Sequence, residues 1–121
     1  MKETMLLYHI SGQARLKKIR TICTSLHIRP RLVKREEYLR PIFQLLSGQP
    51  MAGEQAYRGA ELPGEMLVMA VLRENIDAVL EKLRKEGIQI PLKAVVTPDN
   101  GWWSSLELYE ELQREHRAVN P

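Results

Sequence analysis

The sequence is short of the residues on which several kinds of protein chemistry depend. Cys23 is the only cysteine in the chain, so an internal disulfide and a zinc site built from several cysteines are both excluded. Of the histidines His9, His27 and His116, no two stand at the spacing of a metal-binding pair. Phosphate-binding glycine loops and nucleophile elbows are also missing. We therefore expect no metal, no cofactor and no catalytic residue that the sequence alone identifies.

Long apolar runs are missing as well. No stretch approaches the roughly 20 apolar residues that cross a bilayer, and Met1–Met5 is not followed by an apolar segment of signal-peptide length. With 121 residues, of which 44% are hydrophobic and 27% charged, the composition is that of an ordinary globular protein. We expect residues 1–121 to form a single cytoplasmic domain that has no contact with a membrane.

Apolar patterning predicts two strand–helix–strand units. The first has strands at 5–10 and 28–34 around a helix at 13–26; the second has strands at 65–72 and 90–96 around a helical stripe that runs from Ile76 to Leu83. Leu26-His27-Ile28 aligns with Glu86-Gly87-Ile88, so His27 is expected in the left-handed conformation that suits Gly87.

These units predict an α+β fold, a ferredoxin-like βαββαβ sandwich with a four-stranded antiparallel sheet and both helices on one face. The two most apolar strands, 5–10 and 65–72, are expected in the centre. The outer strands each contain a proline, which suits a sheet edge. An extra C-terminal helix is expected to begin at the capping box formed by Ser104 and Glu107.

The two units are joined by a connector at about 35–64. It is expected to hold one short helix that starts at Pro41, and its part at 48–64, rich in glycine and proline, is interpreted as a flexible insertion. The strand at 65–72 is apolar on both faces, so something must cover the face that the two main helices leave bare. The terminal helix, the connector and a second subunit are all candidates.

The best candidate site is the segment from Thr97 to Ser105, between the fourth strand and the last helix. Its small polar side chains and two tryptophans could form a ligand pocket at a helix N-terminus, for a small molecule or an anion. A purely structural role as turn, cap and packing is the competing interpretation. The candidate ligand-binding residues are Thr97, Asn100, Trp102, Trp103, Ser104 and Ser105.

Charge is unevenly distributed. Residues 1–60 carry 11 lysines and arginines against 4 acids, whereas residues 61–121 carry 7 against 11. A basic patch that contacts nucleic-acid phosphates is one interpretation, and an ordinary solvated surface is the other. Sequence-specific RNA recognition is not expected, because Tyr8 is the only aromatic residue in the two central strands. The candidate patch residues are Lys17, Lys18, Arg20, Arg29 and Arg31.

Several segments of the chain resemble a known family. They are Met5–Tyr8, Glu65–Met69, Leu92–Pro98 with Asn100 and Trp103, Ser105–Leu108, Glu111-Leu112 and Glu115-His116. This pattern is similar to that of the small bacterial proteins grouped as domain of unknown function 3783, over nearly the whole chain except 48–64. The resemblance implies a bacterial cytoplasmic protein and assigns no activity.

Three functions remain open at this point. The first is a non-catalytic binding or regulatory module, with a homodimer through the sheet as a candidate assembly. The second is a nucleic-acid accessory protein without sequence preference. The third is an enzyme that uses the loop at 97–105, for which no acid–base pair can be named.

Overall fold

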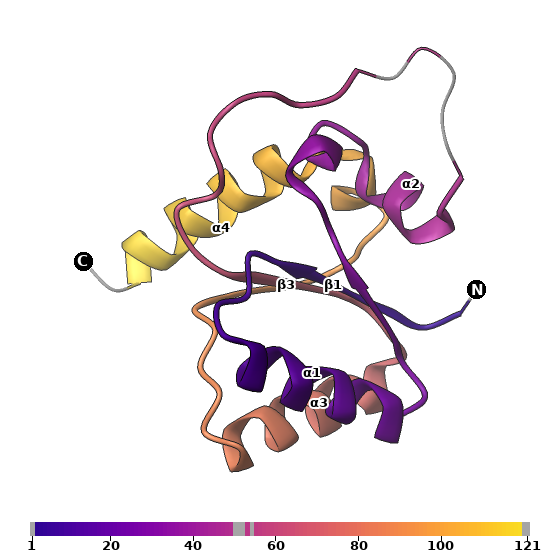
Figure 1. The fold of residues 1–121 in the computed structure, drawn as a ribbon, viewed down its shortest axis with the longest axis vertical. Coiled ribbons are helices and arrows are strands. Elements are labelled where there is room, and N and C mark those ends of the chain that lie inside the picture. The colour runs from indigo at the N-terminus through magenta and orange to yellow at the C-terminus, as the bar shows by residue number, and fades with distance from the viewer. Residues whose placement is uncertain (1, 50–52, 54, 120–121) are drawn as a thin grey trace.

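The computed structural model describes residues 2–49, 53 and 55–119, and its elements form one series that occurs twice (Figure 1). The first series is β1 (Thr4–Tyr8), α1 (Gln13–Ser25), β2 (Arg29–Leu32), the 3₁₀ helix η1 (Arg35–Glu37) and α2 (Ile42–Ser47). The second is β3 (Met66–Ala70), α3 (Arg73–Lys85), β4 (Leu92–Val95), the 3₁₀ helix η2 (Asn100–Trp102) and α4 (Ser105–Val119). The predicted duplication therefore extends beyond strand–helix–strand to a second helical layer. We call residues 4–47 the first repeat and residues 66–119 the second repeat.

The four strands form one mixed sheet in the order β2-β1-β3-β4. The predicted central position of β1 and β3 is confirmed, and these two strands pair antiparallel. Each central strand pairs in parallel with the outer strand of its own repeat, however. The predicted antiparallel sheet is therefore wrong, and the ferredoxin-like strand order is not confirmed. Both arrangements bury the same apolar strands in the centre and leave the same strands at the edges, so the apolar pattern could not distinguish them.

The two repeats are related by an approximate twofold rotation. In the β1–β3 pairing Thr4 faces Ala70 and Tyr8 faces Met66, so exchanging the strands reproduces the register. An isolated antiparallel bridge joins Pro41 to Ser104, the residues that precede α2 and α4. Pro41 thus stands just before the short helix, not at its first helical position as predicted. Equivalent residues differ in number by about 60–63 along the chain.

The ends of α1 and α3 show this equivalence at single residues. His27 has a φ of 59° and Gly87 a φ of 69°, so the predicted left-handed conformation of His27 is confirmed. The residue after each left-handed residue folds back onto its helix: Ile28 N donates to Cys23 O at 2.8 Å, and Ile88 N donates to Leu83 O at 2.9 Å. This is the hydrogen bond of a Schellman cap, and it turns each helix directly into the next strand.

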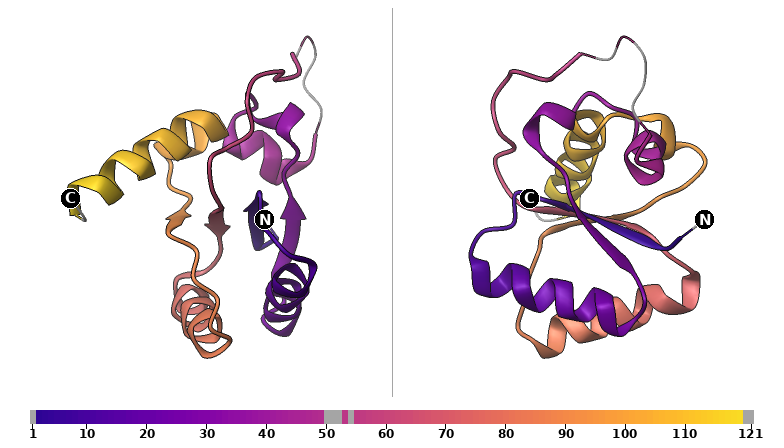
Figure 2. Two further views of the ribbon diagram at one scale, coloured as in Figure 1. Left: turned by 60° about the vertical axis from the view of Figure 1, so that its left-hand side comes forward. Right: turned by 45° about the vertical axis from the view of Figure 1, so that its right-hand side comes forward.

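Helices cover both faces of the sheet. Figure 2 shows α1 and α3 side by side on one face and α2 and α4 on the other. The core between the sheet and the first pair contains Met5, Leu7, Ile19, Cys23, Leu67, Met69, Val79 and Leu83. The core under the second pair contains Leu6, Tyr8, Ile42, Leu45, Leu62, Met66, Val68, Leu92 and Leu108. The face that sequence analysis left bare is therefore covered by α2, α4 and the connector of the same chain.

The connector between the repeats is only partly described, because residues 50–52 and 54 lie outside the described residues. Its last part contacts the core, where Leu62 is 5% exposed. The flexibility expected for 48–64 stays a prediction. Among the described residues no helix combines the length and the apolar character needed to cross a membrane.

Candidate functional site

A pocket of about 410 Å³ opens at the carboxyl ends of β3 and β4. Most of its wall is apolar, and it faces solvent at the edge of the molecule where β1 begins. The lining residues are Glu3, Phe43, Ala70, Val71, Leu72, Val96, Thr97, Pro98 and Trp102. Its volume lies within the range of roughly 300–1,000 Å³ that is usual for ligand sites.

The topology of the sheet creates this pocket. After β3 the chain passes to α3 on one face, and after β4 it passes to η2 and α4 on the opposite face (Figure 1). Two neighbouring parallel strands whose connections leave in opposite directions form a crevice at their carboxyl ends, and such crevices are where open α/β sheets bind ligands. Residues 70–72 supply one wall and residues 96–98 supply the other.

Two aromatic rings form the upper wall. Phe43 of α2 meets Trp102 edge to face, with ring centroids 5.1 Å apart and planes at 87°. Phe43 reaches this position because Gly101 has no side chain, and a Cβ atom at Gly101 would overlap the Phe43 ring. Trp102 is 72% exposed, so most of its surface is available to a ligand.

Glu3 is the only titratable side chain in the pocket wall. Its Oε1 accepts hydrogen bonds from Asn75 Nδ2 at 2.8 Å and from Leu72 N at 2.7 Å. These bonds to the start of α3 lower the pKa of Glu3, with the Asn75 bond the larger cause, so the side chain is a carboxylate at neutral pH. Glu3 thereby caps the helix of the other repeat.

Glu65, the equivalent of Glu3, plays the same part at the start of α1. Its Oε2 accepts from Ser11 N at 2.7 Å and forms an ion pair with Arg15. Burial alone would raise the pKa of Glu65, but the bonds from Arg15 and Ser11 outweigh it and the pKa is lowered. Each repeat therefore uses a glutamate at the start of its own central strand to stabilise the first turn of its partner's helix.

Two of the six predicted ligand-binding residues, Thr97 and Trp102, line the pocket. Asn100 instead holds the turn between them. Its Oδ1 accepts from Thr97 N at 2.8 Å and its Nδ2 donates to Val95 O at 3.1 Å. The first repeat has the same turn, in which Glu37 Oε1 accepts from a backbone N–H three residues earlier at 3.0 Å.

The remaining three predicted residues have structural contacts. Ser104 and Glu107 form the predicted capping box, with bonds of 2.9 and 3.2 Å between each backbone N–H and the other side chain. Ser105 is fully buried, and its hydroxyl lies 2.8 Å from that of Tyr8. The carbonyl of Trp103 accepts a backbone N–H from the start of α2 at 2.9 Å.

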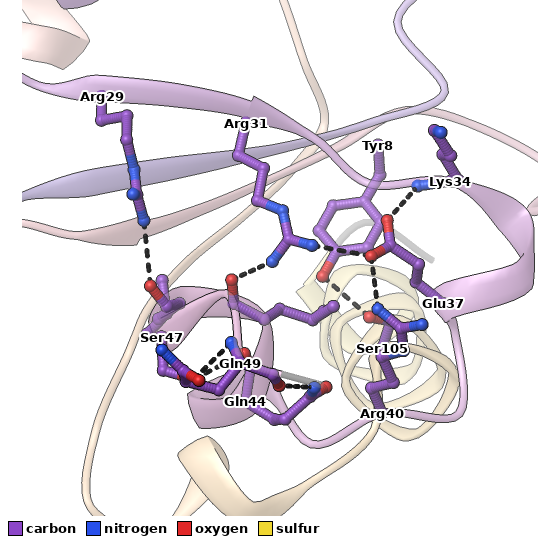
Figure 3. A network of polar contacts seen from close by, with 12 residues as sticks. Tyr8, Arg29, Arg31, Lys34, Glu37, Arg40, Gln44, Ser47, Gln49 and Ser105 are labelled. Atoms are coloured by element: carbon purple, nitrogen blue, oxygen red, sulfur yellow. Dashed lines mark hydrogen bonds and ion pairs between the residues drawn. The ribbon is translucent and has the colours of Figure 1, made fainter. Parts of the chain in front are cut away.

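The five residues of the predicted basic patch do not form one surface. Figure 3 shows Arg29 and Arg31 of β2 pointing to the C-terminal end of α2. Arg29 donates to Leu46 O at 2.9 Å, and Arg31 donates to a carbonyl of α2 and to the buried Glu37, the latter at 2.7 Å. These arginines compensate the negative end of the helix. Arg40 binds the same carboxylate at 2.7 Å, so the charge of Glu37 is matched within the fold.

Lys17, Lys18 and Arg20 lie on α1, on the opposite face of the sheet from α2, and all three are exposed. Lys18 is 3.7 Å from the carboxylate of Glu86. The basic surface that remains for an anionic partner is thus one helix face.

Sequence analysis missed most of the pocket. Five of its nine lining residues are apolar positions that read as ordinary strand ends or core: Phe43, Ala70, Val71, Leu72 and Val96. The strand order would have located these residues, because such a crevice forms where the connections of two neighbouring parallel strands leave to opposite faces of the sheet. No cluster of three or more histidine, cysteine or acidic side chains arranged for a metal occurs within the described part of the chain.

Cys23 is a poor nucleophile in this fold. It is fully buried between α1 and the sheet, with its Sγ 3.7 Å from Met5 Sδ. Burial raises the pKa of the thiol to about 11, so the reactive thiolate is scarce at neutral pH.

Comparison with known proteins adds one match. No curated protein and no solved structure matches the chain. The model of one family, described as a domain of unknown function (DUF3783), matches residues 65–119. The match covers the second repeat, which carries most of the pocket, and not nearly the whole chain as the resemblance in the sequence implied. Residues 65–119, which make up the second repeat, thus match the model of the DUF3783 family.

Proposed function

We propose that the protein is a non-catalytic binding module that holds an apolar group in the pocket between Trp102 and the carboxyl ends of β3 and β4. The observation that carries this proposal is an open apolar pocket at the point where the connections of two parallel strands diverge. Two large apolar side chains stand exposed at its rim, Trp102 at 72% and Leu72 at 57%. Exposed apolar groups beside a cavity are typical of a surface that a ligand completes.

The chemistry of the wall favours binding over catalysis. A hydrolase or transferase needs an acid and a base within reach of the same bond. Glu3 is the single titratable group in the wall, and one of its oxygens already holds the start of α3. This arrangement offers an anchoring carboxylate and an apolar surface, and it supplies no second group for proton transfer.

The expected affinity is modest. An aromatic side chain buries about 150–250 Å², so covering most of the exposed surface of Trp102 contributes ~3 kcal/mol at about 25 cal/mol per Å². A millimolar dissociation constant corresponds to about 4 kcal/mol, and the cost of ordering the ligand must still be subtracted from the gain. Dissociation constants for small probes should therefore be millimolar or weaker, a range that NMR titration measures well.

The test is a titration of the ¹⁵N-labelled protein with p-cresol and 4-methylpentan-1-ol, which have the side-chain chemistry of tyrosine and leucine. Saturable shifts of the Trp102 indole N–H and of the amides at 70–72 and 96–98 are expected. Ala70→Leu, which fills the pocket, should abolish these shifts. A matched control is Ala118→Leu on the exposed end of α4, which should leave them unchanged. If the probes leave these signals unmoved, or shift them equally in Ala70→Leu, the proposal is wrong.

Nucleic-acid binding is a second candidate, supported by the exposed lysines and arginine of α1. It has less support than the pocket, since Arg29 and Arg31 are engaged with α2. Lys17→Glu combined with Lys18→Glu should remove any affinity for a DNA duplex at low salt. Binding that persists in this variant, or that does not weaken with added salt, would contradict it.

Self-association is a separate proposal. Helices of the same chain cover both faces of the sheet, so the surfaces of the sheet that remain for a homodimer are the outer edges of β2 and β4. Light scattering across a range of concentrations tests it, and a monomer mass throughout would exclude it.

A further inference from the structure

We propose that the pocket binds an extended peptide segment through an apolar side chain and its backbone, because the chain already places such a segment at the equivalent position of its first repeat. This inference rests on the proposed function and names the class of ligand. The strands β1 and β2 form a second crevice, related to the pocket by the approximate twofold rotation. There the connections also diverge, since β1 leads to α1 and β2 leads to η1 and α2 on the other face (Figure 1).

The connector occupies this second crevice. Tyr57 N donates to Glu36 O at 3.0 Å, in the segment that follows β2. The carboxylate of Glu61 lies 4.0 Å from His9, the residue that follows β1. Leu62 is buried in the core under α2 and α4. Residues 57–62 therefore cross the carboxyl ends of both strands, and they hold their place by backbone bonding and an apolar anchor.

Aromatic rings fill the space between this segment and the sheet. The ring of Tyr38 lies 6.0 Å from that of Tyr8 and 5.9 Å from that of Tyr57, measured between centroids. The Tyr38 hydroxyl also donates to Glu61. Two of these tyrosines come from the repeat itself and the third from the connector.

The same positions in the second repeat carry no large side chain of their own, although the Phe43 ring lies beside Gly101. Val33 N donates to Leu7 O at 3.0 Å and Val96 N to Met69 O at 2.9 Å, which fixes the equivalence of the two strand pairs. In this register Ala70 is the equivalent of Tyr8. The difference in residue number between Pro41 and Ser104 also relates Tyr38 to Gly101, so Gly101 is the equivalent of Tyr38. The pocket is thus the counterpart of the space that two tyrosines and a strand-like segment fill at the other end, with the Phe43 ring taking part of the position of Tyr38.

The equivalence also indicates what the peptide must carry. Asp99 corresponds to Glu36, so its carbonyl is positioned to accept a backbone N–H of the ligand. Val71 and Pro98 stand in the places of His9 and Arg35. At the first crevice desolvation raises the pKa of the connector's Glu61, but hydrogen bonds from Tyr38 and from Leu62 N, with smaller contributions from His9 and Arg35, outweigh it and the pKa is lowered. A peptide in the open pocket has no such partner for an acidic residue, so an apolar residue is expected there. Backbone bonding with an anchor side chain in a pocket is the general mode of strand-like peptide recognition.

The test uses a capped synthetic peptide that copies residues 56–63 with Glu61→Ala, titrated into the full-length ¹⁵N-labelled protein. The expected result is saturable shifts at 70–72, 96–98 and the Trp102 indole. The peptide should bind about tenfold more tightly than N-acetyl-tyrosine amide or N-acetyl-leucine amide, because the single residues lack the backbone contacts. The unaltered copy, which keeps Glu61, should bind more weakly than the altered one.

Duplication supplies a matched pair of variants. Trp102 and Leu39 are equivalent and both are exposed, at 72% and 45%, but only Trp102 lines the open pocket. Trp102→Ala should weaken the peptide about fivefold or more, as loss of an aromatic anchor does, and Leu39→Ala should leave its affinity unchanged.

Each remaining outcome decides between the two proposals. Equal affinity for the peptide and the capped amino acids would overturn the peptide inference and leave a pocket for single side chains, as first proposed. Peptide shifts confined to other surfaces, or equal effects of Trp102→Ala and Leu39→Ala, would also overturn it. Absence of binding by the peptide, p-cresol and 4-methylpentan-1-ol together would overturn both.

Discussion

The left-handed residues that end α1 and α3 allow a prediction in which one repeat serves as the control for the other. Gly87 occurs at φ 69° with nothing within 4 Å of the position that a Cβ would take. Gly87→Ala therefore introduces no clash, and its effect is purely conformational. An L-residue in this region costs about 1–2 kcal/mol, and loss of glycine's freedom in the unfolded chain returns about 0.4–1 kcal/mol. We expect Gly87→Ala to lower the free energy of unfolding by about 1 kcal/mol.

His27→Gly is the reverse change at the equivalent position. His27 already bears the left-handed cost at φ 59°, and its side chain is exposed. Histidine tolerates this region better than most residues, so the gain should be smaller, about 0.5 kcal/mol. Urea unfolding followed by circular dichroism at constant m-value measures both changes. Gly87→Asn is the control and should lose less than Gly87→Ala, because asparagine adopts this conformation readily. An unchanged Gly87→Ala, or a destabilised His27→Gly, would refute the assignment of equivalent helix ends.

Three further predictions concern side-chain packing at Gly101, a buried hydrogen bond and the ion pair of Glu65. Gly101→Ala should lower the free energy of unfolding by about 1–3 kcal/mol and displace the Phe43 ring, because the new Cβ would overlap that ring. Calorimetry and the NMR signals of Phe43 measure these effects, and an unchanged melting temperature would contradict the prediction. Tyr8→Phe should lower the free energy of unfolding by about 1–2 kcal/mol, because the buried Ser105 hydroxyl loses its hydrogen-bond partner. Urea unfolding measures this loss, and the double variant Tyr8→Phe/Ser105→Ala should recover part of it. Acid should also destabilise the protein. Because the pKa of Glu65 is lowered in the fold, its contribution to the stability of the folded state is present above the ordinary pKa of 4.5 and is lost as pH falls through the folded pKa. A Glu65→Gln variant whose acid transition is as steep as that of the parent would argue against this prediction.

Local structure could be read from the sequence where a pattern of a few residues decides it. Alternating and helical spacing of apolar residues located the strands and main helices to within a few residues. The alignment of His27 with Gly87 predicted a backbone conformation correctly, since a helix that turns at once into a strand requires it. The capping box of Ser104 and Glu107 was also predicted correctly, because this motif is contained within four residues.

Strand order was beyond the reach of these patterns. Both the predicted and the observed sheet place 5–10 and 65–72 in the middle, and they differ only in the neighbour that each outer strand selects. Backbone hydrogen bonds make that choice, and they carry no side-chain signature. The error extended to the site, because a crevice between parallel strands cannot be expected in an antiparallel sheet. Thr97 and Trp102 were found from the loop that contains them, whereas Phe43 and Ala70 come from segments far away in the sequence.

The arginines of β2 illustrate a second limit. A run of cations beside a basic helix indicates an anion-binding surface, but Arg29 and Arg31 point to the face where α2 ends. The short helix was predicted, yet its position against β2 depends on the bridge between Pro41 and Ser104, which joins the two repeats. Contacts that depend on the relation between distant segments are not visible in either segment alone.

The bridge between Pro41 and Ser104 and the pairing of β1 with β3 hold together, within one polypeptide, what would otherwise be the two subunits of a symmetric assembly. In a homodimer every substitution appears twice, so both ends must change together. Here one end can be closed by its own tyrosines while the other stays open, as Tyr8 and Ala70 demonstrate. Joining both halves in one chain thus lets one crevice be filled while the other stays open, which the proposed peptide site requires.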